Sequence, residues 1–161
     1  MSFTEGSYEN ALITLYENMG YQHLYGPDIE RDYYVPFYEE QVLNSLTTIN
    51  PSKPQTAIHE AIAKLKDIDT GSLTQKNELF MDYLQHGVEV SYFDGKEQRN
   101  EIVYLIDYEH INRNDFQIAN QWTFVENSEK RADMIVFING LPLVVIELKS
   151  PSREETDASE A

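Results

Sequence analysis

The chain has 161 residues, 41% of them hydrophobic, so it can bury a core of about one domain. Its 28 acidic against 12 basic residues give a formal net charge of −16, which excludes strong nonspecific binding to nucleic acid or to an anionic membrane surface. The absence of cysteine excludes disulfides and thiolate chemistry. With no secretory signal and no apolar run long enough to span a bilayer, we expect a cytoplasmic protein with no membrane partner.

The first half of the chain has the 3.6-residue period of amphipathic helices. Four helices are predicted, over residues 8–19, 36–49, 54–65 and 74–86. Gly20 suits the C-terminal end of the first helix, and Pro36 and Pro54 suit the first turns of the second and third.

From Val88 onward the period changes to two, which is typical of strands. The Asp94-Gly95 pair predicts a hairpin turn after the first strand. Strands are predicted over residues 88–93, 102–108, 122–126, 132–138 and 143–148. The last two are apolar at both odd and even positions, so we expect both of their faces to be covered.

These elements predict an α/β fold of the α+β kind, with a mostly antiparallel or mixed sheet flanked by helices. We expect one domain over residues 1–150, made of a helical lead-in, 1–87, and a sheet-rich core, 88–150, that contains the hairpin 132–149. The polar segment 151–161 is expected to start a helix of a longer polypeptide.

Most sequence patterns that carry chemistry are missing. The chain has no glycine-rich phosphate loop, no G-x-S-x-G elbow and no H-E-x-x-H zinc helix. Its four histidines are far apart in sequence, and we interpret each as a surface or capping residue rather than a metal ligand.

One group of charged residues lies beside apolar strands, where burying a charge costs free energy. Asp133 stands at the start of an apolar strand, and Glu147 and Lys149 follow the apolar run that forms its hairpin partner. Residues two apart in a strand share a face, so Glu147 and Lys149 are expected to project together. An ordinary Glu–Lys salt bridge at a hairpin end is the structural alternative.

The three side chains are sufficient for phosphodiester hydrolysis. Two neighbouring carboxylates, Asp133 and Glu147, suit Mg²⁺, which takes oxygen ligands from few side chains and keeps several waters. The metal ion polarises a phosphoryl oxygen and lowers the pKa of a bound water. A lysine beside it can orient the attacking water or neutralise developing charge.

The segment from Arg131 to Lys149, with its Asn-Gly-Leu-Pro-Leu-Val centre, resembles the nuclease motif in the N-terminal domain of the restriction (R) subunit of type I restriction-modification enzymes. The resemblance extends to residues 4–13 with Gly20-Tyr21, and to residues 103–107, 112–114 and 120–121. It therefore covers nearly the whole chain.

The resemblance implies a restriction-endonuclease-like core of the PD-(D/E)xK class that cuts double-stranded DNA with Mg²⁺. It makes Asp133 and Glu147 the metal ligands and Lys149 the catalytic lysine. Glu9 and Glu5 are candidates for a further acidic site residue on the opening helix, and solvated helix charges are the alternative for each.

The resemblance also implies parts that this sequence lacks. Family members carry an ATP-driven DNA translocase after the nuclease, and a Gln-x-x-x-Tyr element after Glu-x-Lys; neither occurs here. ATP would therefore act only in the missing motor region. The implied partners are the methyltransferase and specificity subunits, which recognise the target. The charge of −16 agrees with a domain to which a motor must deliver DNA.

Two other functions remain open at this point. The first is a noncatalytic docking domain that keeps the fold, although all three site residues are present. The second is a repair or recombination nuclease of the same superfamily.

The hairpin register follows from counting. If Asn139-Gly140 formed a strict two-residue loop, Asp133 would lie opposite Ile146, and Glu147 would point to the other face. Shared coordination requires Asp133 to lie opposite Glu147. We therefore predict a three-residue or bulged turn at residues 139–141, with Asp133, Glu147 and Lys149 on one face.

Overall fold

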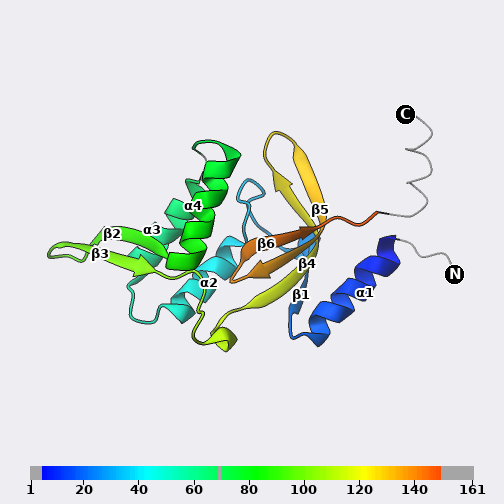
Figure 1. Ribbon diagram of the computed structural model, residues 1–161, viewed down its shortest axis with the longest axis horizontal. Coiled ribbons are helices and arrows are strands. Elements are labelled where there is room, and N and C mark those ends of the chain that lie inside the picture. Colours follow the sequence, from blue (N-terminus) through cyan, green and yellow to red (C-terminus); the bar gives the residue numbers. More distant parts are fainter. Residues whose placement is uncertain (1–4, 69, 150–161) are drawn as a thin grey trace. The chain divides into compact units, whose positions relative to one another are not determined.

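The computed structural model describes residues 5–68 and 70–149, and the segment 151–161 lies outside this part (Figure 1). The helices are α1 (Glu5–Asn18), α2 (Glu39–Ile49), α3 (Gln55–Lys66) and α4 (Leu73–His86). The strands are β1 (Gln22–Tyr25), β2 (Val88–Phe93), β3 (Gln98–Val103), β4 (Phe116–Val125), β5 (Glu129–Ile138) and β6 (Leu141–Ile146). Short 3₁₀ turns occupy Gly26–Asp28 and Ile111–Arg113. The predicted α/β class is confirmed.

The four predicted helices all form, and local signals account for their ends. Ser72 and Gln75 satisfy each other's backbone N–H groups at the start of α4 in a capping box. Gly87, with a φ of 84°, ends the same helix. The second helix begins later than predicted, at Glu39 rather than at Pro36.

One strand was not predicted, and the predicted strands after β2 are wrong in extent, most clearly β3 and β4. β1 was not predicted, because its four residues are largely polar and it is held by parallel pairing with β4. β3 covers 98–103 rather than 102–108, because the tight hairpin after β2 pairs Phe93 with Gln98 and recruits polar residues. β4 begins at Phe116, six residues before the predicted start at Trp122.

Asp94 stabilises the turn of the β2–β3 hairpin. Its carboxylate accepts hydrogen bonds from the backbone N–H groups of Lys96 and Glu97 and from Arg99 Nε. The Arg99 guanidinium and these two N–H groups lower the pKa of Asp94 to about 2. The Asp-Gly turn signal in the sequence therefore corresponds to a well-satisfied turn.

The strands form two separate sheets. One has four strands in the order β1-β4-β5-β6, with β1 parallel to β4, and the other is the antiparallel pair β2-β3. The chain divides into two compact units. The first takes in the chain up to Pro36, Phe116–Phe137 and the chain from Pro142 on, and the second takes in Phe37–Asp115 and Ile138–Leu141.

In the first unit, α1 packs on the four-stranded sheet. Ile13 of α1 belongs to a buried cluster with Ile118 of β4 and with Met134 and Val136 of β5. Trp122 and Phe137 are fully buried and meet edge to face, with ring centroids 4.8 Å apart. The core of the second unit is built from α2, α3 and β2, including Leu46, Ile58 and Val88.

The tip of the β5–β6 hairpin is held by its asparagine. The Asn139 side chain is fully buried, accepts from the backbone N–H of Asp115 and donates to Leu105 O and Asn114 Oδ1, each at 2.8 Å. A Cβ at Gly140 would lie 2.7 Å from Tyr38 O, so a larger residue does not fit there.

The predicted odd-length or bulged turn at residues 139–141 is wrong. β5 ends at Ile138 and β6 begins at Leu141, so two residues connect them. Both have positive φ, 52° at Asn139 and 78° at Gly140, as a type I′ turn requires. The asparagine tolerates this conformation, and its side-chain hydrogen bonds select it.

Candidate active site

Asp133 lies in β5 between two buried neighbours. Ala132 and Met134 are buried, whereas Asp133 is half-exposed and points to the opposite face from them. Asp133 Oδ2 accepts a hydrogen bond of 2.7 Å from the backbone N–H of Leu148. This bond fixes the segment that contains Glu147 and Lys149 beside the Asp133 carboxylate.

Glu147 and Lys149 lie just after β6, and both are exposed. Within the described part of the chain, neither side chain forms an ion pair or a hydrogen bond. The structural alternative, an ordinary Glu147–Lys149 salt bridge, is therefore not formed. As far as the described residues go, both charged groups are therefore available to other partners.

The end of β6 packs on the side of the sheet that α1 covers. Ile146 and Leu148 both pack against the cluster that contains Met134 and Val136. Strict pairing from a two-residue turn would instead put Ile146 on the same face as Asp133.

Glu9 connects α1 with β4. It is half-buried, and its two carboxylate oxygens accept hydrogen bonds from Asn120 Nδ2, at 2.5 Å, and Gln121 Nε2, at 3.2 Å. Consecutive residues of a regular strand point to opposite faces, but Gln121 has a φ of 55°. This left-handed residue interrupts the alternation and allows both amides to reach one carboxylate.

The structure brings a histidine into the same group. His23 of β1 is half-buried, and its Nε2 lies 2.8 Å from Asn120 Oδ1. From the sequence alone, His23 is interpreted as a surface or capping residue and Asn120 and Gln121 have no place in the site, because their proximity depends on parallel pairing between segments about 97 residues apart. Glu5 is the first residue of α1, and its side chain lies outside the described part.

We expect Glu9→Ala to destabilise the 161-residue chain by about 1–3 kcal/mol, because two amide donors lose their acceptor. Urea unfolding followed by the fluorescence of Trp122, the single tryptophan, measures this. Glu17→Ala, at an exposed position of the same helix, is the matched control and should change stability by less than about 0.5 kcal/mol. Equal effects of the two substitutions would contradict an anchoring role for Glu9.

The donor groups at Asp133 and Glu147 suit a hard cation. Among residues 5–68 and 70–149, no three His, Asp or Glu side chains are grouped so that they could hold a metal ion. Mg²⁺ needs only one or two carboxylates, because waters and substrate phosphates complete its shell. Asp133 and Glu147 have no cationic partner among the described residues, so their charges are available for such an ion.

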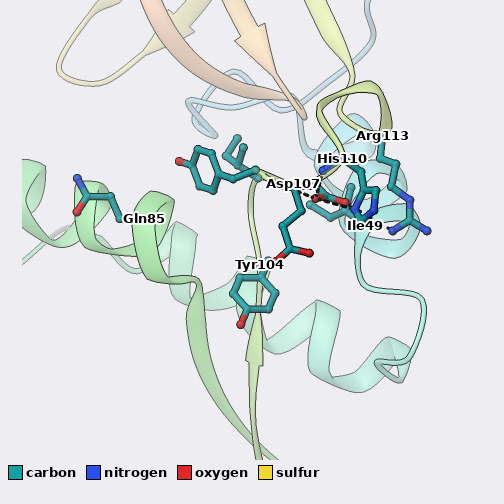
Figure 2. A pocket seen from close by; sticks show the side chains of 9 residues that line it. Ile49, Gln85, Tyr104, Asp107, His110 and Arg113 are labelled. Carbon is teal, nitrogen blue, oxygen red and sulfur yellow. Dashed lines mark hydrogen bonds and ion pairs between the residues drawn. The ribbon is translucent and has the colours of Figure 1, made fainter.

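A separate pocket of about 380 Å³ lies in the second unit (Figure 2). Figure 2 shows Asp107 pointing toward His110 and Arg113; its carboxylate lies 3.5 Å from His110 Nδ1 and forms a long ion pair of 3.6 Å with Arg113. The backbone N–H of His110 is the main cause that lowers the pKa of Asp107. Because Arg113 compensates the charge of Asp107, and none of the predicted site residues lines the pocket, the site does not lie there.

The structure thus defines an α/β protein in which an aspartate and a Glu-x-Lys segment meet at one end of a β-hairpin. Residues 2–161 match the family described as type I restriction enzyme R protein N terminus, and the chain belongs to this family. The resemblance seen in the sequence is therefore confirmed. In the described part of the chain, no helix is both long and apolar enough to cross a membrane.

The chain is similar to proteins that are named type I restriction enzyme endonuclease subunits. The type I restriction enzyme HindI endonuclease subunit of Haemophilus influenzae is 32% identical over 98% of this chain and 16% of its own length. The type I restriction enzyme EcoprrI endonuclease subunit of Escherichia coli is 28% identical over 91% of this chain and 44% of its own length. The chain therefore spans about one sixth of the Haemophilus relative.

Proposed function

We propose that this chain is the Mg²⁺-dependent endonuclease domain of a type I restriction enzyme and hydrolyses phosphodiester bonds of double-stranded DNA. Membership of the R-subunit family and the bond from Leu148 N–H to Asp133 Oδ2 are the observations that carry the proposal. That bond joins the two halves of the expected Asp and Glu-x-Lys site. The core is then restriction-endonuclease-like, and the domain acts in the cytoplasm.

The packing at the end of β6 supports a shared face for the site residues. Because Ile146 and Leu148 both contact the cluster around Met134, the residue between them in an extended chain, Glu147, is directed away from it. Asp133 is also directed away from that cluster, since it is next to Met134 in β5. This arrangement allows the two carboxylates to approach each other despite the two-residue turn.

The proposed roles follow from the chemistry of these groups. Asp133 and Glu147 would hold Mg²⁺, which supplies charge stabilisation and a water of lowered pKa when bound. The exposed ammonium of Lys149 would orient the attacking water and neutralise charge on the phosphate. Leu148 N–H keeps the Asp133 carboxylate directed toward this segment.

The proposal includes partners. In this role the domain works with methyltransferase and specificity subunits, and an ATP-driven motor in the remainder of the subunit delivers the DNA. Glu147 and Lys149 are exposed and have no partner among residues 5–68 and 70–149, which favours catalysis over a purely docking role, for which a salt bridge would suffice. Family membership argues against a repair nuclease.

The decisive experiment is plasmid cleavage by the reconstituted complex of the full-length subunit and its partners. We expect cutting with Mg²⁺, none after chelation, and full recovery when Mg²⁺ is added back. ATP hydrolysis by the motor also uses Mg²⁺, so the DNA is first translocated with the metal present. The Asp133→Asn variant is the second comparison, because it removes only the nuclease site. Cleavage by Asp133→Asn at the wild-type rate would contradict the proposed function.

A further inference from the structure

Basic side chains are outnumbered on this acidic chain. The net charge is −16, and five of the Lys and Arg side chains that the structure describes form ion pairs with carboxylates. Among the described arginines, Arg99 pairs with Asp94 and Glu97, and Arg113 pairs with Asp107. Arg31 is half-buried and stacks on Trp122, with its guanidinium carbon 3.7 Å from the ring centroid.

Arg131 differs from these three. It is exposed and, in the described part of the chain, has neither an ion pair nor a hydrogen bond. It lies two residues before Asp133 in β5, so the two side chains share a face of the strand. Lys130, the next residue toward the N-terminus, points to the other face and lies 3.7 Å from Glu126.

Arg131 lies where a positive charge can offset the repulsion between the site carboxylates and a DNA phosphate. Asp133 and Glu147 repel the DNA phosphate that has to approach them, and the overall charge of the chain increases this repulsion. A guanidinium on the same face offsets the repulsion and can donate two parallel hydrogen bonds to a phosphate group. An unpaired arginine needs no internal bond to be broken before it binds.

We propose that Arg131 binds a phosphate of the DNA backbone next to the scissile bond and positions the strand over Asp133 and Glu147. This assignment rests on the proposed nuclease function and adds a substrate-binding residue to it. Lys149 lies at the end of the Glu-x-Lys segment that Asp133 holds, so Arg131 and Lys149 each lie two residues in sequence from one of the carboxylates.

The test uses the reconstituted full-length complex and three variants. Arg131→Gln should lower the DNA cleavage rate about 10- to 100-fold, because one charge-assisted phosphate contact is lost. Arg131→Lys should recover most of the rate, since it keeps the charge but not the paired hydrogen bonds. Lys130→Gln removes the same charge from the opposite face and should stay within about twofold of the wild type.

Salt dependence separates a phosphate contact from a structural role. The ratio of the wild-type rate to the Arg131→Gln rate should fall as salt rises, with a logarithmic slope of about −0.9 for one contact. The melting temperature and ATP hydrolysis should not change, because Arg131 is exposed and has no partner among the described residues.

The outcomes distinguish this assignment from the function on which it rests. Wild-type cleavage by Arg131→Gln, an equal loss in Lys130→Gln, or a loss that follows a lowered melting temperature would overturn the role of Arg131 and leave the nuclease intact. A complex that does not cut DNA, or that cuts equally well with Asp133→Asn, would overturn both.

Discussion

Lys149→Ala is expected to lower DNA cleavage by the reconstituted complex at least about 100-fold while ATP hydrolysis continues at the wild-type rate. The Lys149 ammonium is exposed and unpaired within the described chain, so its loss removes transition-state stabilisation without breaking a contact of the fold. Plasmid linearisation and ATP hydrolysis, measured in the same reaction, separate the two activities.

The matched control is Lys96→Ala, which removes an exposed lysine from the β2–β3 turn. It should leave both activities unchanged, because the turn is held by the Asp94 carboxylate and the backbone N–H of Lys96 rather than by its side chain. Cutting by Lys149→Ala at the control rate would remove Lys149 from the proposed chemistry.

Asp133→Ala is expected to weaken Mg²⁺ binding by the nucleotide-free full-length subunit at least about tenfold, because one of two carboxylate ligands is lost. Isothermal titration calorimetry with Mg²⁺ measures the affinity. Asp133→Asn should weaken binding similarly while retaining an oxygen that can accept from Leu148 N–H. The asparagine variant therefore separates loss of the metal ligand from loss of the backbone contact.

Glu129→Gln is the control for this titration. Glu129 is exposed, lies in the same strand and shares a face with Asp133, but is four residues away. It should bind Mg²⁺ like the wild type. If Asp133→Ala and Glu129→Gln bound Mg²⁺ equally well, the proposed metal site at Asp133 would be wrong.

The hairpin shows how far a sequence argument can be taken. Counting residues predicted a longer turn so that Asp133 and Glu147 could share a face. The turn has two residues, because the side chain of Asn139 finds partners at Leu105, Asn114 and Asp115. The counting assumed that strict pairing continues from the turn to the end of the strands, which would put Ile146 on the face of Asp133. Ile146 instead packs beside Met134 and Val136, on the other face.

The sequence by itself determined the features that depend on local spacing. These are the four helices, the Asp94-Gly95 turn, the α/β class and the Asp133 and Glu-x-Lys pattern. Helix period, capping and turn preferences act between residues that are close in sequence, so they can be read without the fold.

Only the tertiary structure decided the features that join distant segments. It recruited polar residues into β1 and β3, and it set Glu9 against Asn120 and the left-handed Gln121. It also placed Leu148 N–H on Asp133. These contacts depend on strand order and on which buried polar groups find partners, and neither is specified by the local period of the chain.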